Sequence, residues 1–69
     1  SVSEVSGTLT QVSTMNKTIQ LTTNGGSLTL TWSDASYLPR NLNDFLNRKV
    51  EVEYQTVNGE NRLRKLKPD

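Results

Sequence analysis

Apolar and polar residues alternate through much of this 69-residue chain. Ile19 and Leu21 stand between polar residues. Leu28, Leu30 and Trp32 repeat the pattern after a short gap. A period of two places alternate side chains on opposite faces of a β-strand, so that one face can be buried. The pattern predicts strands around one small core, since a chain this short buries only about 60% of the surface that its unfolded form exposes.

An earlier alternating series predicts a first strand that is bent. It contains Val5, Gly7 and Leu9, and it changes parity at Val12, as happens where a strand bends or carries a bulge. Between the second and third series lie residues 24–26, Asn-Gly-Gly, which tolerate positive φ and favour a tight hairpin. We therefore expect the second and third strands to pair antiparallel.

The apolar spacing changes after the third strand and predicts a short helix. The residues that would share one helix face are Leu38, Leu42, Phe45 and Leu46. Asn41 is the expected N-cap, because its side-chain oxygen can accept a hydrogen bond from the first helical turn.

Alternation returns near the end of the chain and predicts a second hairpin. Val50, Val52 and Tyr54 alternate with charged residues. Asn58-Gly59 then marks a turn into a last strand over residues 61–66.

The predicted order is three strands, a short helix and two strands, which resembles the OB-fold, a small five-stranded Greek-key barrel. The resemblance covers nearly the whole chain as a topology match, without a diagnostic motif. It implies an all-β fold with the helix between strands three and four. An SH3-like barrel is the alternative, but it would place its helical turn between the last two strands. We expect residues 1–69 to form one barrel domain, cut from a longer or processed protein because the chain starts with Ser1.

Histidine and cysteine are both absent. Their absence removes the commonest general base, the thiol nucleophile and the usual zinc ligands. Glu51 and Glu53 share a strand face, but their alternation with apolar residues indicates a solvated outer face and not an acid–base pair. We therefore expect no enzymatic activity and no cofactor.

The chain is also similar, in length and strand order, to some small periplasmic copper-binding proteins with an OB-type barrel. That resemblance implies a soft-metal site made of methionines, a histidine and a nearby tryptophan. This chain has one methionine, Met15, and one tryptophan, Trp32. A Cu(I) site would lack soft ligands, so we expect no metal site, with Met15 on a loop and Trp32 in the core.

A basic cluster in the predicted last strand is the main functional signal. Residues 62–67 hold four of the eight positive charges, in a chain whose net charge is only +1. A basic strand can follow a phosphate backbone, since neutralising phosphates releases counterions. The same charges would also protect an exposed edge strand from aggregation.

We interpret the chain as a non-catalytic module that binds single-stranded nucleic acid weakly through this strand. The expected binding residues are Lys17, Tyr37, Arg62, Arg64, Lys65 and Lys67. The sequence departs from nucleic-acid-binding OB-folds in one respect. Those domains stack bases on aromatic side chains, whereas the outer face of strands two and three carries only Thr18, Gln20, Thr22, Thr29 and Thr31.

The missing aromatic face motivates an alternative. The chain would then be a protein-interaction or assembly domain of a larger protein, using a barrel edge or this threonine-rich face. Carbohydrate recognition, a third interpretation, would need an aromatic face for a sugar ring, and none is evident in the sequence.

Overall fold

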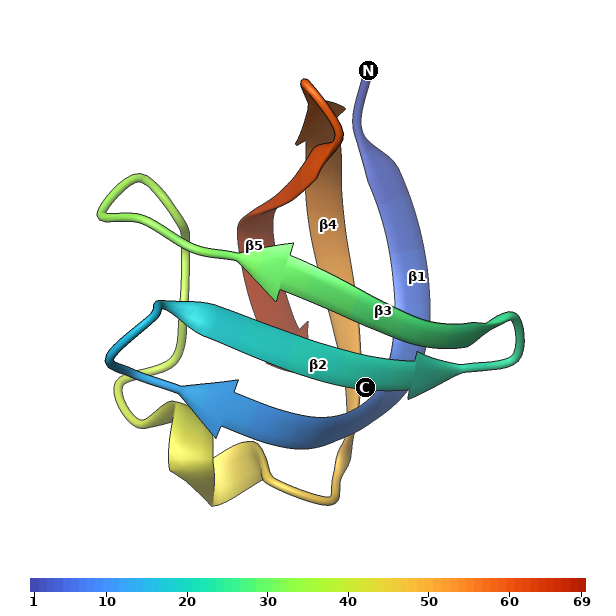
Figure 1. Cartoon of the computed structure of the whole chain (residues 1–69). Helices are drawn as coiled ribbons and strands as arrows, with labels where there is room; N and C mark the ends of the chain where they lie inside the picture. The colour runs from blue at the N-terminus through green and yellow to red at the C-terminus, as the bar shows by residue number, and fades with distance from the viewer.

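The computed structural model describes all 69 residues as five strands and one short 3-10 turn (Figure 1). The elements are β1 (Ser3–Ser13), β2 (Thr18–Thr23), β3 (Gly26–Thr31), η1 (Leu42–Phe45), β4 (Lys49–Val57) and β5 (Glu60–Pro68). The strands close into a barrel in the order β1-β2-β3-β5-β4. All pairs are antiparallel except β3 with β5. The predicted all-β, five-stranded barrel is confirmed, and no helix is long and apolar enough to cross a membrane.

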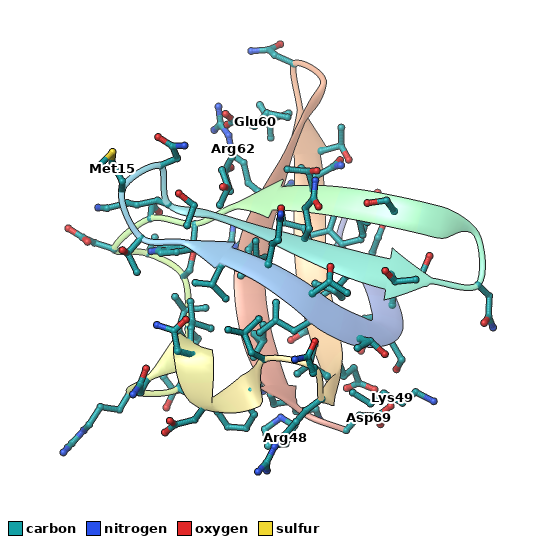
Figure 2. The ribbon with its side chains drawn as sticks, turned by 60° about the horizontal axis from the view of Figure 1, so that its bottom comes forward. Met15, Arg48, Lys49, Glu60, Arg62 and Asp69 are labelled. Carbon is teal, nitrogen blue, oxygen red and sulfur yellow. The ribbon has the colours of Figure 1, made fainter.

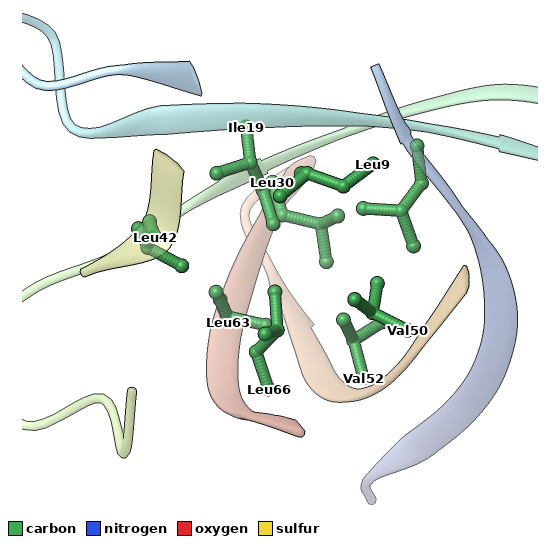
Figure 3. Packing of buried hydrophobic residues seen from close by; sticks show 9 residues of the cluster. Leu9, Ile19, Leu30, Leu42, Val50, Val52, Leu63 and Leu66 are labelled. Atoms are coloured by element: carbon green, nitrogen blue, oxygen red, sulfur yellow. The ribbon is translucent and has the colours of Figure 1, made fainter. Parts of the chain in front are cut away.

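The helical element lies between β3 and β4, as expected for the barrel and unlike the SH3-like alternative. It is one 3-10 turn, shorter than the predicted helix. Asn41 is its N-cap, and its side-chain oxygen accepts a hydrogen bond of 3.2 Å from the backbone N–H of Asn43. Leu42 points from this turn into one end of the core (Figure 3).

The core is built from the alternating residues of all five strands and Leu42. Its members are Leu9, Ile19, Leu21, Leu30, Leu42, Val50, Val52, Leu63 and Leu66 (Figure 3). Trp32, predicted to lie in the core, packs against this cluster but is only partly buried, because β3 ends one residue before it. No side-chain polar atom is buried without a hydrogen-bond partner.

β1 is long and pairs with two strands. Its first half, from Ser3 to Thr8, pairs with β4, and its second half, from Thr8 to Ser13, pairs with β2. The register shifts between Leu9 and Gln11, which agrees with the predicted parity change before Val12. Where β1 leaves one partner for the other, Gly7 lies against the end of β2.

β3 and β5 pair at only one register position, Thr31 with Arg62. Beyond that position, the segment that follows β3 makes the hydrogen bonds to β5. The backbone N–H of Tyr37 donates to the Arg64 carbonyl oxygen at 2.7 Å, and the N–H of Leu66 donates to the Tyr37 carbonyl oxygen at 3.0 Å. The Ser36 hydroxyl donates to the Leu63 carbonyl oxygen at 2.5 Å. We call residues 33–38 the strap.

Replacing Gly7 with alanine tests the close approach of β1 to β2. A Cβ atom at this position would lie 2.6 Å from the Thr22 carbonyl oxygen and 3.1 Å from Cγ2 of Thr23. The nearer atom belongs to paired backbone and cannot move freely. We therefore expect Gly7→Ala to lower the free energy of unfolding by about 1–3 kcal/mol, measured by urea denaturation. Gly25→Ala is the matched control, because its nearest atom lies 3.8 Å away. It should change stability by less than about 0.5 kcal/mol, and equal losses in the two variants would contradict the close approach.

Replacing Ser36 with alanine tests the strap. The Leu63 carbonyl oxygen would lose this donor, and the Ser33 N–H would lose the Ser36 hydroxyl as its acceptor. We expect the free energy of unfolding to fall by about 1–2 kcal/mol. Ser27→Ala, at an exposed position of β3, should leave stability unchanged in the same urea titration. An unaltered Ser36→Ala variant would show that the strap hydrogen bond contributes nothing.

Candidate functional site

A hollow of about 430 Å³ lies where the β1–β2 turn, the end of β3 and the start of β5 meet. Its lining includes Asn16, Lys17, Thr31, Trp32, Glu60 and Arg62. We call it the Trp32 hollow. The turn adopts a left-handed conformation at Lys17, with φ of 55°. The Lys17 carbonyl oxygen accepts a hydrogen bond of 2.9 Å from the Trp32 N–H, which fixes the turn against the end of β3.

Several hydrogen-bond donors in this hollow have no acceptor within the protein. The Nε of Arg62 donates to Oε1 of Glu60 at 2.8 Å, which leaves the terminal amino groups of the guanidinium unpaired. The indole N–H of Trp32 also makes no hydrogen bond, and it reaches solvent, since no unpaired polar atom is buried. A ligand rich in acceptors would satisfy these donors.

A second, smaller hollow of about 190 Å³ lies on the other side of Arg62. Its lining includes Ser33, Ser36, Gln55, Arg62, Leu63 and Arg64. We call it the Arg64 hollow. One terminal amino group of Arg64 donates to Oε1 of Gln55 at 3.3 Å, which holds the guanidinium over β4. No carboxylate lines this hollow.

The two hollows together carry more positive than negative charge. Lys17, Arg62 and Arg64 face one lining carboxylate, that of Glu60. Asp34 lies near the rim, where Oδ1 is 3.8 Å from Nζ of Lys17, but its side chain is fully exposed. An ion pair this exposed is worth about 0–1 kcal/mol, so Lys17 stays available to another anion.

The structure brings only three of the six predicted binding residues together. Lys17 and Arg62 line the Trp32 hollow, and Arg64 lines the next one. Lys67 lies further along β5, with Nζ 3.2 Å from Oε1 of Glu51. Lys65 sits opposite Glu53 in the β4–β5 register, and Tyr37 is 74% exposed on the strap. The six residues therefore do not form one continuous binding surface.

Two further cations, Arg48 and Lys49, lie at the far end of the barrel. Figure 2 shows Glu60 and Arg62 at one end and Arg48, Lys49 and Asp69 at the other. Nζ of Lys49 is 4.0 Å from a carboxylate oxygen of Asp69. This separation also argues against one basic surface.

The sequence interpretation missed Trp32, Glu60 and Gln55 as site residues. Trp32 lines the Trp32 hollow and also a hollow on its other side that includes Leu38 and Arg40. The signal that could have identified it is its place as the last apolar residue of its alternating series, directly before Ser33 and Asp34. A residue at the end of a strand lies at the rim of a barrel, where it can be half-buried.

The structure has no group of three or more His, Cys, Asp or Glu residues placed to hold a metal ion. Met15, the one sulfur-bearing side chain, is 93% exposed on the β1–β2 turn and points away from the barrel (Figure 2).

No family model matches the chain, and no curated protein matches it by sequence. Solved structures of CusF from Escherichia coli do match its fold. CusF with Ag(I) has a TM-score of 0.87 at 12% identity, covering 100% of this chain and 92% of that one. A tryptophan-to-alanine CusF variant with Cu(II) also has a TM-score of 0.87 at 12% identity, covering 99% of this chain and 91% of that one. Apo-CusF has a TM-score of 0.86 over 100% of this chain and 88% of that one.

These comparisons overturn the nucleic-acid prediction. The matching structures are CusF with Ag(I), a CusF variant with Cu(II) and apo-CusF, and none of these descriptions mentions nucleic acid. The predicted single-stranded nucleic-acid partner is therefore wrong, in agreement with the scattered cations and the missing aromatic face. The alternative of a protein-interaction domain fits the same comparisons no better. At 12% identity the likeness establishes the fold: a closed five-stranded barrel of the shape seen in CusF.

Proposed function

We propose that this chain is an OB-like, non-catalytic barrel that binds a small anionic ligand in the Trp32 hollow. The observation that carries the proposal is that one hollow is lined by Arg62 and Trp32, which have unpaired N–H donors, and by Lys17, whose ion-pair partner Asp34 is fully exposed. The strand order and the position of η1 between β3 and β4 support the OB-like assignment.

Arg62 is suited to hold a carboxylate or a similar planar anion. A guanidinium binds such groups through two parallel N–H donors, and these charge-assisted hydrogen bonds are about twice as strong as neutral ones. Glu60 bonds only to Nε, so it orients the side chain without occupying the terminal amino groups. Asn16 and Thr31 add neutral polar groups to the same hollow.

The donor set does not fit the ions found in the CusF structures. Ag(I) is a soft ion that prefers thiolate and thioether ligands, and Cu(II) prefers imidazole and other nitrogen or oxygen ligands. Here one exposed thioether is present, and the Trp32 hollow is lined by two cations, Lys17 and Arg62, and one carboxylate, that of Glu60. The excess of positive charge favours an anion over a metal cation in this hollow.

The proposal is tested by titrating the protein with galacturonate, citrate and sulfate while recording tryptophan fluorescence. Trp32 is the single tryptophan and lines this hollow, so a ligand bound there should change its emission. We expect saturable binding of at least one anion, and we expect Arg62→Ala to weaken it at least tenfold, or about 1.4 kcal/mol. Arg48→Ala is the matched control, because it removes the same charge at the far end of the barrel. Equal weakening in both variants, or no saturable binding, would refute the proposal.

A second titration separates this proposal from metal binding. Ag(I) added to the protein should produce no saturable fluorescence change and no metal-bound species in native mass spectrometry, because soft ligands are too few. Met15→Leu should leave the result unchanged. A one-to-one Ag(I) complex that Met15→Leu abolishes would show that the barrel holds a soft metal despite its composition.

A further inference from the structure

We infer that the ligand is a short acidic sugar chain of at least two units, lying across the Trp32 and Arg64 hollows. This inference rests on the proposed function and adds the class of ligand.

The two hollows are direct neighbours on the surface. They share Ser33, Ser36, Arg62 and Leu63, so the wall between them is the start of β5 and the strap. The strap hydrogen bonds hold this wall in place. A ligand longer than one ring would pass over Arg62 from the first hollow to the second.

The lining of the Trp32 hollow suits a sugar ring better than a bare anion. Only two of its nine lining residues are hydrophobic, Trp32 and Leu63, and the others carry hydroxyl, amide or charged groups. A pyranose ring has an apolar C–H face and a hydroxylated edge. The half-buried indole of Trp32 offers the matching combination, a flat apolar surface with one free N–H donor. The aromatic surface that the sequence did not reveal is therefore present at the rim of the barrel.

The arginines indicate repeated negative charge along the ligand. Arg62 and Arg64 are two residues apart on β5, a distance of about 6.6 Å along the strand. Both line the Arg64 hollow, which has no carboxylate. One anionic group in the Trp32 hollow would bind Arg62, and a second group on the same ligand would then reach Arg64 in the neighbouring hollow. Uronic acids carry one carboxylate on each ring and so match this series.

The experiment compares galacturonic acid with its dimer and trimer by isothermal titration calorimetry. We expect the dissociation constant to fall at least tenfold from the monomer to the dimer. Arg64→Gln should remove this gain, so that the dimer binds no more than about twofold more tightly than the monomer. Trp32→Leu, which keeps an apolar side chain against the core, should weaken the binding of all three sugars at least fivefold. Lys67→Gln is the matched control on β5, because Lys67 lines neither hollow, and it should change nothing. Circular dichroism confirms that each variant is folded.

The outcomes separate this inference from the proposed function. Affinity that does not depend on chain length, with Arg62 still required, would overturn the sugar chain and leave the small-anion site intact. Tripolyphosphate carries several negative charges but no sugar ring. If it binds as tightly as the trimer, negative charges alone are sufficient for binding, and the assignment of the ligand as a sugar is wrong. Neutral maltotriose binding as tightly as the trimer would overturn the requirement for negative charge. Binding of none of these compounds would remove both proposals.

Discussion

The double pairing of β1 is the constraint on which the rest of the structure depends. One strand hydrogen-bonds to β4 through its first half and to β2 through its second half, which joins both sides of the sheet into a closed barrel. This requires β1 to turn sharply over the end of β2, where the Thr22 carbonyl oxygen leaves no room for a side chain at position 7. Closure gathers nine buried apolar residues into one cluster, so a small chain can bury a core without disulfides.

Although the barrel is closed, β3 and β5 are only partly paired, and the candidate site lies beside this incomplete pairing. The two strands meet at one register position, and the strap completes the hydrogen bonding of β5 beyond it. The hollows form where the strap, the β1–β2 turn and the start of β5 come together. Because the polar lining residues come from the rim, those side chains can vary without disturbing the buried cluster, to which only Leu63 of the lining belongs. The same architecture can therefore carry ligands of different chemistry.

The sequence predicted the strands well because alternation reports directly on burial. The cluster residues on β2, such as Ile19 and Leu21, follow the predicted parity, and the hairpin at Asn58-Gly59 has the positive φ angles that these residue types favour. The helix was predicted too long. Apolar spacing alone does not locate the two ends of the helical element. Pro39 precedes it, and a proline disfavours helical backbone at the residue before it. Asn47, with φ of 65°, departs from helical backbone two residues after Phe45.

The site was less predictable, because charge clusters along a strand are not clusters in space. From Arg62 to Lys67, β5 extends by about 16 Å at about 3.3 Å per residue, so four neighbouring cations in the sequence reach from one end of the barrel toward the other. What distinguishes Arg62 is its surroundings: a carboxylate that bonds only to Nε, a half-buried indole nearby, and a turn that carries another cation. These neighbours come from β1–β2, β3 and β5, and their meeting depends on the barrel register. Similarity to CusF in backbone shape therefore coexists with a rim hollow whose own lining carries more positive than negative charge, because the side chains at the rim are set by the sequence and not by the barrel.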